Sequence, residues 1–95
     1  MIKHIIMFQL TEPTPANLGH LSEILMELPS KIEVIRHMET GVDLLRTERS
    51  MDLVLISHFD SLDDLSHYST HPEHLKVVAW VRANCKLIKA VDFEV

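Results

Sequence analysis

The sequence predicts an α+β domain in which four antiparallel strands carry helices on one face. Short apolar stretches, alternating or continuous, are typical of strands, and they lie at residues 1–10, 32–38, 52–59 and 88–95. Apolar residues at helical spacing separate the first stretch from the second and the third from the fourth. The resulting order, β-α-β-β-α-β, is the split, ferredoxin-like arrangement with a four-stranded antiparallel sheet.

Local features of the sequence predict each helix and loop between the strands. Residues 16–28 form a helix because leucine and isoleucine recur there every three or four positions, and Pro29 ends it. Residues 41–50 are predicted as a polar loop. Ser61 is placed to cap the second helix, with acidic residues next to it at the positive end of the dipole. The predicted inner side of that helix carries Leu62, Leu65 and Tyr68.

The first and third strands are apolar on both faces. Ile5 and Met7 lie opposite the face that carries Ile2, Ile6 and Phe8, and Val54 and Ile56 lie opposite Leu53 and Leu55. Helices cover only one face, so these side chains would leave a patch that monomers rarely expose. Burying each is worth about 1.5–3 kcal/mol. We expect a homodimer through the open face of the sheet, at Ile5, Met7, Val54 and Ile56. The alternative is that residues 41–50 or the C-terminal segment folds over that face.

Composition excludes several classes of partner. The chain has 95 residues, 46% of them hydrophobic, and is expected to form one domain, 1–95. Its net charge of −5 and scattered basic residues argue against binding to nucleic acid or to an anionic membrane. Cys85 is the single cysteine, and neither a secretory signal nor a membrane span is visible. We therefore expect a cytoplasmic protein.

The segment from Tyr68 to His74 gathers groups that transfer protons. Pro72 disfavours helix in the residue before it, so the helix that carries Tyr68 should end near Thr70. Pro72 then suits the first position of a new helix, with His74 in its opening turn. The positive end of the helix dipole disfavours a charged imidazole there, so His74 is expected to be neutral, as a general base must be. His71 is expected either to cap this corner or to point into solvent.

His4 shares a strand face with apolar residues. A histidine in such a row is either a hydrogen-bonded core residue or part of a site. If the corner lies over the end of the first strand, His4, Tyr68 and His74 converge on an apolar cavity, which is the usual form of a small-molecule site. The predicted wall is Ile6, Phe8, Leu21, Leu25, Leu55, Val78 and Trp80. Lys76 and Arg82 near the mouth are either solvated or favour an anionic ligand.

The chain resembles the stress-responsive A/B barrel domain (Dabb) family of the dimeric α+β barrel superfamily. The matching pieces are the opening MIKHIIMF, the middle SMDLVLISHFDS, the corner YSTHPEH and the ending VDFEV. In order, they span nearly the whole chain. The resemblance implies a dimer whose two sheets close into one barrel. In members that cyclise a linear polyketide, it implies a histidine base at His74, a tyrosine at Tyr68 that holds a carbonyl oxygen, and a pocket histidine at His4.

Neither a metal nor a cofactor is expected. His67, His71 and His74 have helical ligand spacing, but the break before Pro72 separates them, and no cysteine ligand accompanies them. With only two glycines, the chain has no phosphate-binding loop.

Two functions are therefore considered. The first is a homodimer that binds a small, mainly apolar, carbonyl-containing molecule and catalyses cofactor-free acid/base chemistry on it, with His74, Tyr68 and His4 as catalytic residues. The second is a non-enzymatic, stress-responsive or ligand-sequestering protein with structural histidines. A protein-interaction module without a ligand cavity is a third possibility.

Overall fold

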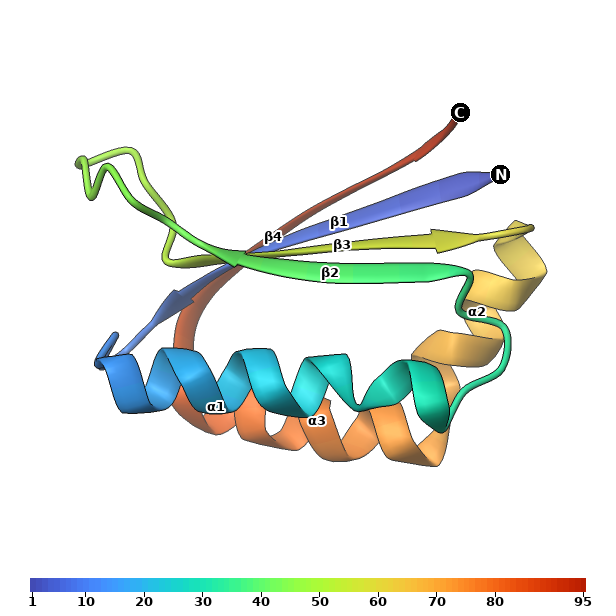
Figure 1. Cartoon of the computed structure of the whole chain (residues 1–95), viewed down its shortest axis with the longest axis horizontal. Helices are drawn as coiled ribbons and strands as arrows, with labels where there is room; N and C mark the ends of the chain where they lie inside the picture. The colour runs from blue at the N-terminus through green and yellow to red at the C-terminus, as the bar shows by residue number, and fades with distance from the viewer.

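The computed structural model describes residues 1–95 as one antiparallel sheet with its helices beneath it (Figure 1). The sheet order is β2-β3-β1-β4, and every neighbouring pair of strands is antiparallel. The predicted ferredoxin-like fold is therefore confirmed. The elements, in chain order, are β1 (Ile2–Leu10), α1 (Pro15–Met26), a short 3₁₀ helix (Leu28–Ser30), β2 (His37–Val42), β3 (Leu53–Phe59), α2 (Leu62–Thr70), α3 (Pro72–Asn84) and β4 (Cys85–Glu94).

The hydrophobic core lies between the sheet and the helices. From the sheet it receives the even-numbered side of β1 and the odd-numbered side of β3, as the alternation predicted. From the helices it receives Leu21 and Leu25 of α1, and Val77 and Val81 of α3. Alternation in β1 thus decides which side chains meet the helices and which face away.

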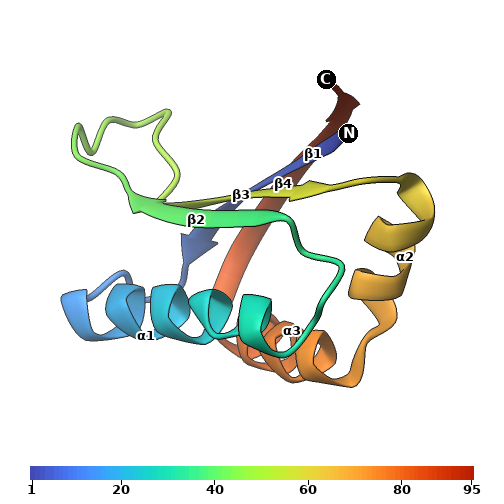
Figure 2. The same ribbon diagram turned by 45° about the vertical axis from the view of Figure 1, so that its right-hand side comes forward.

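The opposite face of the sheet has no helix over it (Figures 1 and 2). Ile5 lies directly between Ile56 of β3 and Val91 of β4, which makes an apolar row across three strands. Met7 keeps 38% of its surface exposed, and Phe93 keeps 45%. The loop after β2 rises away from the sheet, and the C-terminal segment is β4 itself, beside β1 (Figure 2). Neither segment covers this face, so the alternative to a partner subunit is not supported.

The second strand was predicted in the wrong place. It runs over His37–Val42, whereas most of residues 32–38 belong to an irregular connection. Ile32 and Ile35 are nevertheless buried in the core, with 1% and 9% of their surface exposed. Their apolar pattern reflects a buried connection and not a strand.

Other differences are smaller. Helix α1 ends at Met26, and Leu28 is buried in the 3₁₀ helix that follows. Leu62 was predicted to face inward but is 65% exposed, because it is the first residue of α2 and lies at the outer end of that helix. Ser61 caps α2 as predicted, since its hydroxyl accepts from the Asp64 N–H at 3.1 Å. No helix combines the length and apolar character needed to cross a bilayer.

A buried carboxylate ties the loop after β2 to the end of β1. Asp52 is 4% exposed, and its carboxylate accepts from the Leu10 N–H at 2.8 Å and from Arg46 Nη2 at 2.7 Å. A buried charge is tolerated only when it is paired and hydrogen-bonded, and Asp52 meets both conditions.

Replacing Asp52 with alanine should lower the free energy of unfolding by about 2–4 kcal/mol, because the Leu10 N–H and Arg46 would lose their acceptor. Urea unfolding measures this loss. Glu48→Ala, at an exposed position of the same loop, is the control and should change the free energy by less than about 0.5 kcal/mol. Equal effects of the two substitutions would contradict the assignment.

Candidate functional site

A cavity of about 320 Å³ lies between the sheet and the helices. Its polar lining comes from β1, α2 and α3, and its wall is otherwise mostly apolar. It therefore has the form of a small-molecule site, an apolar hollow with a few convergent polar groups. The aliphatic and aromatic wall residues are Ile6, Phe8, Leu25, Leu55, Tyr68, Val77, Val78, Val81 and Ile88.

The break at Pro72 brings Tyr68 and His74 together. Helix α2 ends at Thr70 and α3 starts at Pro72, as predicted. His71 caps the N-terminus of α3, since its Nδ1 accepts from the Glu73 N–H at 3.1 Å. The rings of Tyr68 and His74 consequently lie 4.3 Å apart, centroid to centroid, although they belong to different helices.

Tyr68 presents a buried hydroxyl that has no hydrogen-bond partner. The residue is 1% exposed, its ring packs 5.0 Å from that of Phe59, and its hydroxyl oxygen is unpaired. Burial raises the pKa of this hydroxyl well above its ordinary value, so it stays protonated. A buried polar group without a partner is uncommon, because its desolvation is not compensated. Because Tyr68 is also one of the residues that line the cavity, its hydroxyl is the candidate donor to a ligand there.

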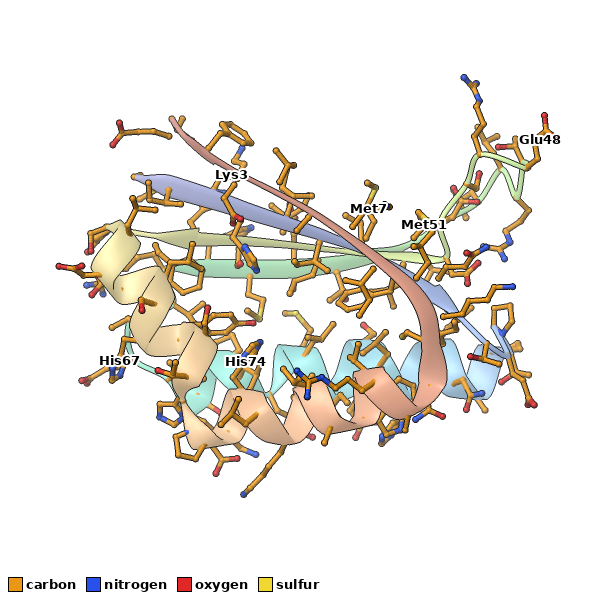
Figure 3. All side chains as sticks on the ribbon, turned by 180° about the vertical axis from the view of Figure 1, so that it is seen from behind. Lys3, Met7, Glu48, Met51, His67 and His74 are labelled. Atoms are coloured by element: carbon orange, nitrogen blue, oxygen red, sulfur yellow. The ribbon has the colours of Figure 1, made fainter.

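His74 is held in a single neutral tautomer. Its Nδ1 lies 2.9 Å from the Ser69 carbonyl oxygen, which only accepts hydrogen bonds, so Nδ1 carries the hydrogen and Nε2 carries the lone pair. Burial lowers the pKa of His74, and the nearby imidazoles of His4 and His71 lower it further, against an opposing effect of the Ser69 carbonyl. Figure 3 shows His74 on the inner side of the α2–α3 corner, whereas His67 lies on the outside.

His4 is paired with an acid that sequence reasoning missed. Its Nδ1 contacts a carboxylate oxygen of Asp92, its direct neighbour across the β1–β4 ladder. The ring centroids of His4 and Tyr68 are 6.1 Å apart, and both residues line the same cavity. Asp92 also lines a wider hollow of about 550 Å³, whose eight lining residues include four acidic and three hydrophobic ones. Period-two alternation in the last strand puts Asp92 on the helix side, but only the register identifies its partner.

Not every predicted wall residue lies on the cavity. Leu21 is fully buried in the core and is not among the residues that line this cavity. Trp80 also lies elsewhere, with its ring against His20 at a centroid distance of 5.1 Å. Lys76 pairs with Glu73, whereas Arg82 does line the cavity. His4, Tyr68 and His74 all line it, with Ile6, Phe8, Leu25, Leu55 and Val78.

The remaining reactive groups do not form a second centre. No cluster of three or more histidine, cysteine or acidic side chains is arranged to hold a metal ion. Burial raises the pKa of the Cys85 thiol, and the charge of Asp52 adds to the effect, so the thiol stays protonated. Chemistry without a cofactor stays a prediction.

The fold and the cavity define a ferredoxin-like α+β protein with a ligand-sized hollow between its sheet and its helices and an uncovered face on the other side of the sheet. The chain belongs to the stress responsive A/B barrel domain (Dabb) family, whose model matches residues 2–95. No curated protein matches it significantly.

Solved structures agree with this membership. A dimeric protein of unknown function with a ferredoxin-like fold, from Bacteroides fragilis, is 32% identical, with a TM-score of 0.86 over 99% of this chain and 95% of that one. A dimeric ferredoxin-like protein of unknown function from Thermobifida fusca is 25% identical, with a TM-score of 0.87 over 99% and 90%. The hydroxynitrile lyase of Passiflora edulis is 14% identical, with a TM-score of 0.87 over 99% and 92%, and shows similarity of fold alone.

Tyr68→Phe should leave the free energy of unfolding unchanged or raise it by up to about 1 kcal/mol, because the hydroxyl removed is desolvated and unpaired. Ser22→Ala is the comparison. It removes a hydroxyl that is bonded to Thr40 at 2.6 Å, so it should lower the free energy by about 1 kcal/mol. If Tyr68→Phe destabilises the protein more than Ser22→Ala does in urea unfolding, the Tyr68 hydroxyl has a partner in the folded protein.

Proposed function

We propose that this protein is a homodimer whose subunits each bind a small, mainly apolar carbonyl compound and catalyse cofactor-free proton transfer on it. The observation that carries the proposal is the unpaired hydroxyl of Tyr68, a residue that lines an apolar cavity beside a neutral His74. A carbonyl oxygen is an acceptor that would satisfy this hydroxyl. Carbonyl compounds also gain acidity at the adjacent carbon when that oxygen is stabilised.

The reaction uses the two groups together. The Tyr68 O–H donates to the substrate carbonyl oxygen, and His74 Nε2 removes a proton from the neighbouring carbon. The C–H electron pair becomes the C=C bond of an enolate, whose negative oxygen is stabilised by the Tyr68 hydrogen bond. In a substrate with a second carbonyl, the enolate carbon attacks it and closes a ring. The imidazolium of His74 then returns its proton to the alkoxide, so protons and charge balance.

His4 acts as an orienting partner. Its bond to Asp92 fixes the ring through Nδ1, and His4 is one of the residues that line the cavity. From there it restrains the Tyr68 ring, together with Phe59, which lies 6.3 Å from His4, centroid to centroid. Such support keeps a donor in position without a direct bond to it.

The dimer forms through the open face of the sheet, at Ile5, Met7, Val54 and Ile56. Two observations support this arrangement. Apolar side chains on that face are half-buried or exposed in the single subunit, and similar structures are described as dimeric. A two-fold partner would bury the same patch on both subunits. The cavity lies on the other side of the sheet, so dimerisation leaves it accessible.

The second candidate is a ligand-sequestering protein without catalysis. It is favoured by the hydrogen bonds of His4 to Asp92 and of His74 to Ser69, which give both imidazoles a structural role. Ligand binding is common to both candidates, and proton transfer belongs only to the first.

Hydrogen–deuterium exchange into a ligand distinguishes the catalytic candidate from the ligand-sequestering one. In D2O, the protein should accelerate deuterium uptake beside the carbonyl of a medium-chain methyl ketone, measured by mass spectrometry. His74→Gln should reduce this acceleration by about a hundredfold, whereas His67→Gln, at an exposed position on α2, should not. Binding of the ketone without acceleration would favour sequestration.

The pH dependence of that exchange follows from the two pKa shifts. The pKa of His74 lies below its ordinary value of 6.5, so the base stays neutral at pH 6.5 and activity falls only at more acidic pH. The pKa of Tyr68 lies above its ordinary value of 10.0, so the donor keeps its proton and the profile stays level up to that pH. A half-maximal rate above pH 6.5 would contradict the assignment of His74 as the base.

Met7→Lys should convert the dimer to monomers at micromolar concentration, because it places a charge in the proposed apolar interface. Analytical ultracentrifugation measures the change. Leu75→Lys is the matched control: Leu75 is 51% exposed on α3, away from the open sheet face, and its replacement should leave the dimer intact. A monomeric unmodified protein, or a dimeric Met7→Lys variant, would refute the interface.

A further inference from the structure

The cavity has two chemically different ends. His74, Val78 and Arg82 follow one another at intervals of four residues along α3, and all three line it. Eight residues of helix span about 12 Å, so the cavity extends roughly that far along α3. On β1 it runs from His4 to Phe8, a similar length for an extended strand. The lining is therefore a channel with proton-transfer groups at one end and Arg82 at the other.

Arg82 is the only charged side chain on the cavity lining. It forms no ion pair, whereas Arg36 is bonded to Asp60 and Arg46 to Asp52. Arg82 is exposed and also lines the cavity, as do Ser69 and Ile88, so the Arg82 end of the channel is open to solvent. A guanidinium with free N–H groups binds a carboxylate through two parallel hydrogen bonds.

The wall between the two ends is apolar. Ile6 of β1 and Val78 of α3 occupy the middle of the channel, and Phe8 pairs with Ile88 close to the Arg82 end. A hydrocarbon chain fits this section, since it leaves no polar group without a partner. At the His74 end of the channel, the Tyr68 hydroxyl has no hydrogen-bond partner and can donate to an acceptor on the ligand.

We propose that the ligand is an elongated oxo acid, with its carboxylate bound by Arg82, its hydrocarbon chain along Ile6 and Val78, and its carbonyl at Tyr68. The assignment rests on the proposed function for the carbonyl end, and adds the substrate class and a specificity-determining residue. Arg82 sets which compounds enter and in which direction, so that the carbonyl and not the carboxylate reaches His74. Cationic ligands are excluded at the mouth by charge.

Calorimetric titration with decanoate, methyl decanoate and decanol tests the role of Arg82. The three probes share an apolar chain and differ in the end group. Decanoate should bind about tenfold more tightly than the ester or the alcohol, and the preference should shrink as salt is added. Arg82→Gln should abolish the preference and leave binding of decanol unchanged. Arg49→Gln, at an exposed arginine outside the cavity, is the control and should retain it.

The outcomes separate the two proposals. Equal affinity for the three probes, or a preference that survives in Arg82→Gln, overturns the carboxylate site while the apolar cavity still binds ligands. Absence of binding by all three overturns the proposed function as well. A decanoate preference that is lost in Arg82→Gln and kept in Arg49→Gln supports the oxo acid.

Discussion

The structure depends on a sheet that is apolar on both faces, although the helices of the chain cover only one of these faces. The helices cover the side that carries Phe8, Leu55 and Phe59, where the core forms. On the other side, Ile5, Ile56 and Val91 make a row with no cover from this chain. A soluble protein rarely leaves such a row open, so the demand for a partner subunit follows from the alternation of side chains along β1 and β3. The proposed dimer through this face would leave the other face free to hold the cavity.

A second constraint, the proline at the α2–α3 corner, organises that cavity. In an unbroken helix, the hydrogen bonds of the backbone would be satisfied within it, and the Ser69 carbonyl would have no imidazole beside it. The break lets His74 donate to that carbonyl and turns its ring against Tyr68. One local irregularity thus fixes the tautomer of His74 and its distance from Tyr68. The cost is a desolvated Tyr68 hydroxyl without a partner, which is the kind of unfavourable feature that proteins retain at functional sites.

Much of this could be predicted from sequence, because the strongest signals are local. The two-faced strands, the break at Pro72 and the cap at Ser61 depend on near neighbours and are confirmed. The predicted strand at 32–38 was wrong because the buried side chains of Ile32 and Ile35 look alike in a strand and in a packed connection. The His4–Asp92 pair joins residues at opposite ends of the chain, so strand register had to be known. Leu21 and Leu25 share one helical stripe, yet only Leu25 reaches the cavity.

The proposed function depends on a hydrogen bond from the Tyr68 hydroxyl to the carbonyl oxygen of a ligand. Infrared spectroscopy of a carbon-13-labelled medium-chain methyl ketone bound to the protein tests it most directly, since a hydrogen bond to the oxygen lowers the carbonyl stretching frequency. The account predicts a lower frequency in the unmodified protein than in alkane solvent, and a return to the alkane value in Tyr68→Phe. An alkane-like frequency in both proteins would show that the hydroxyl does not hold the carbonyl.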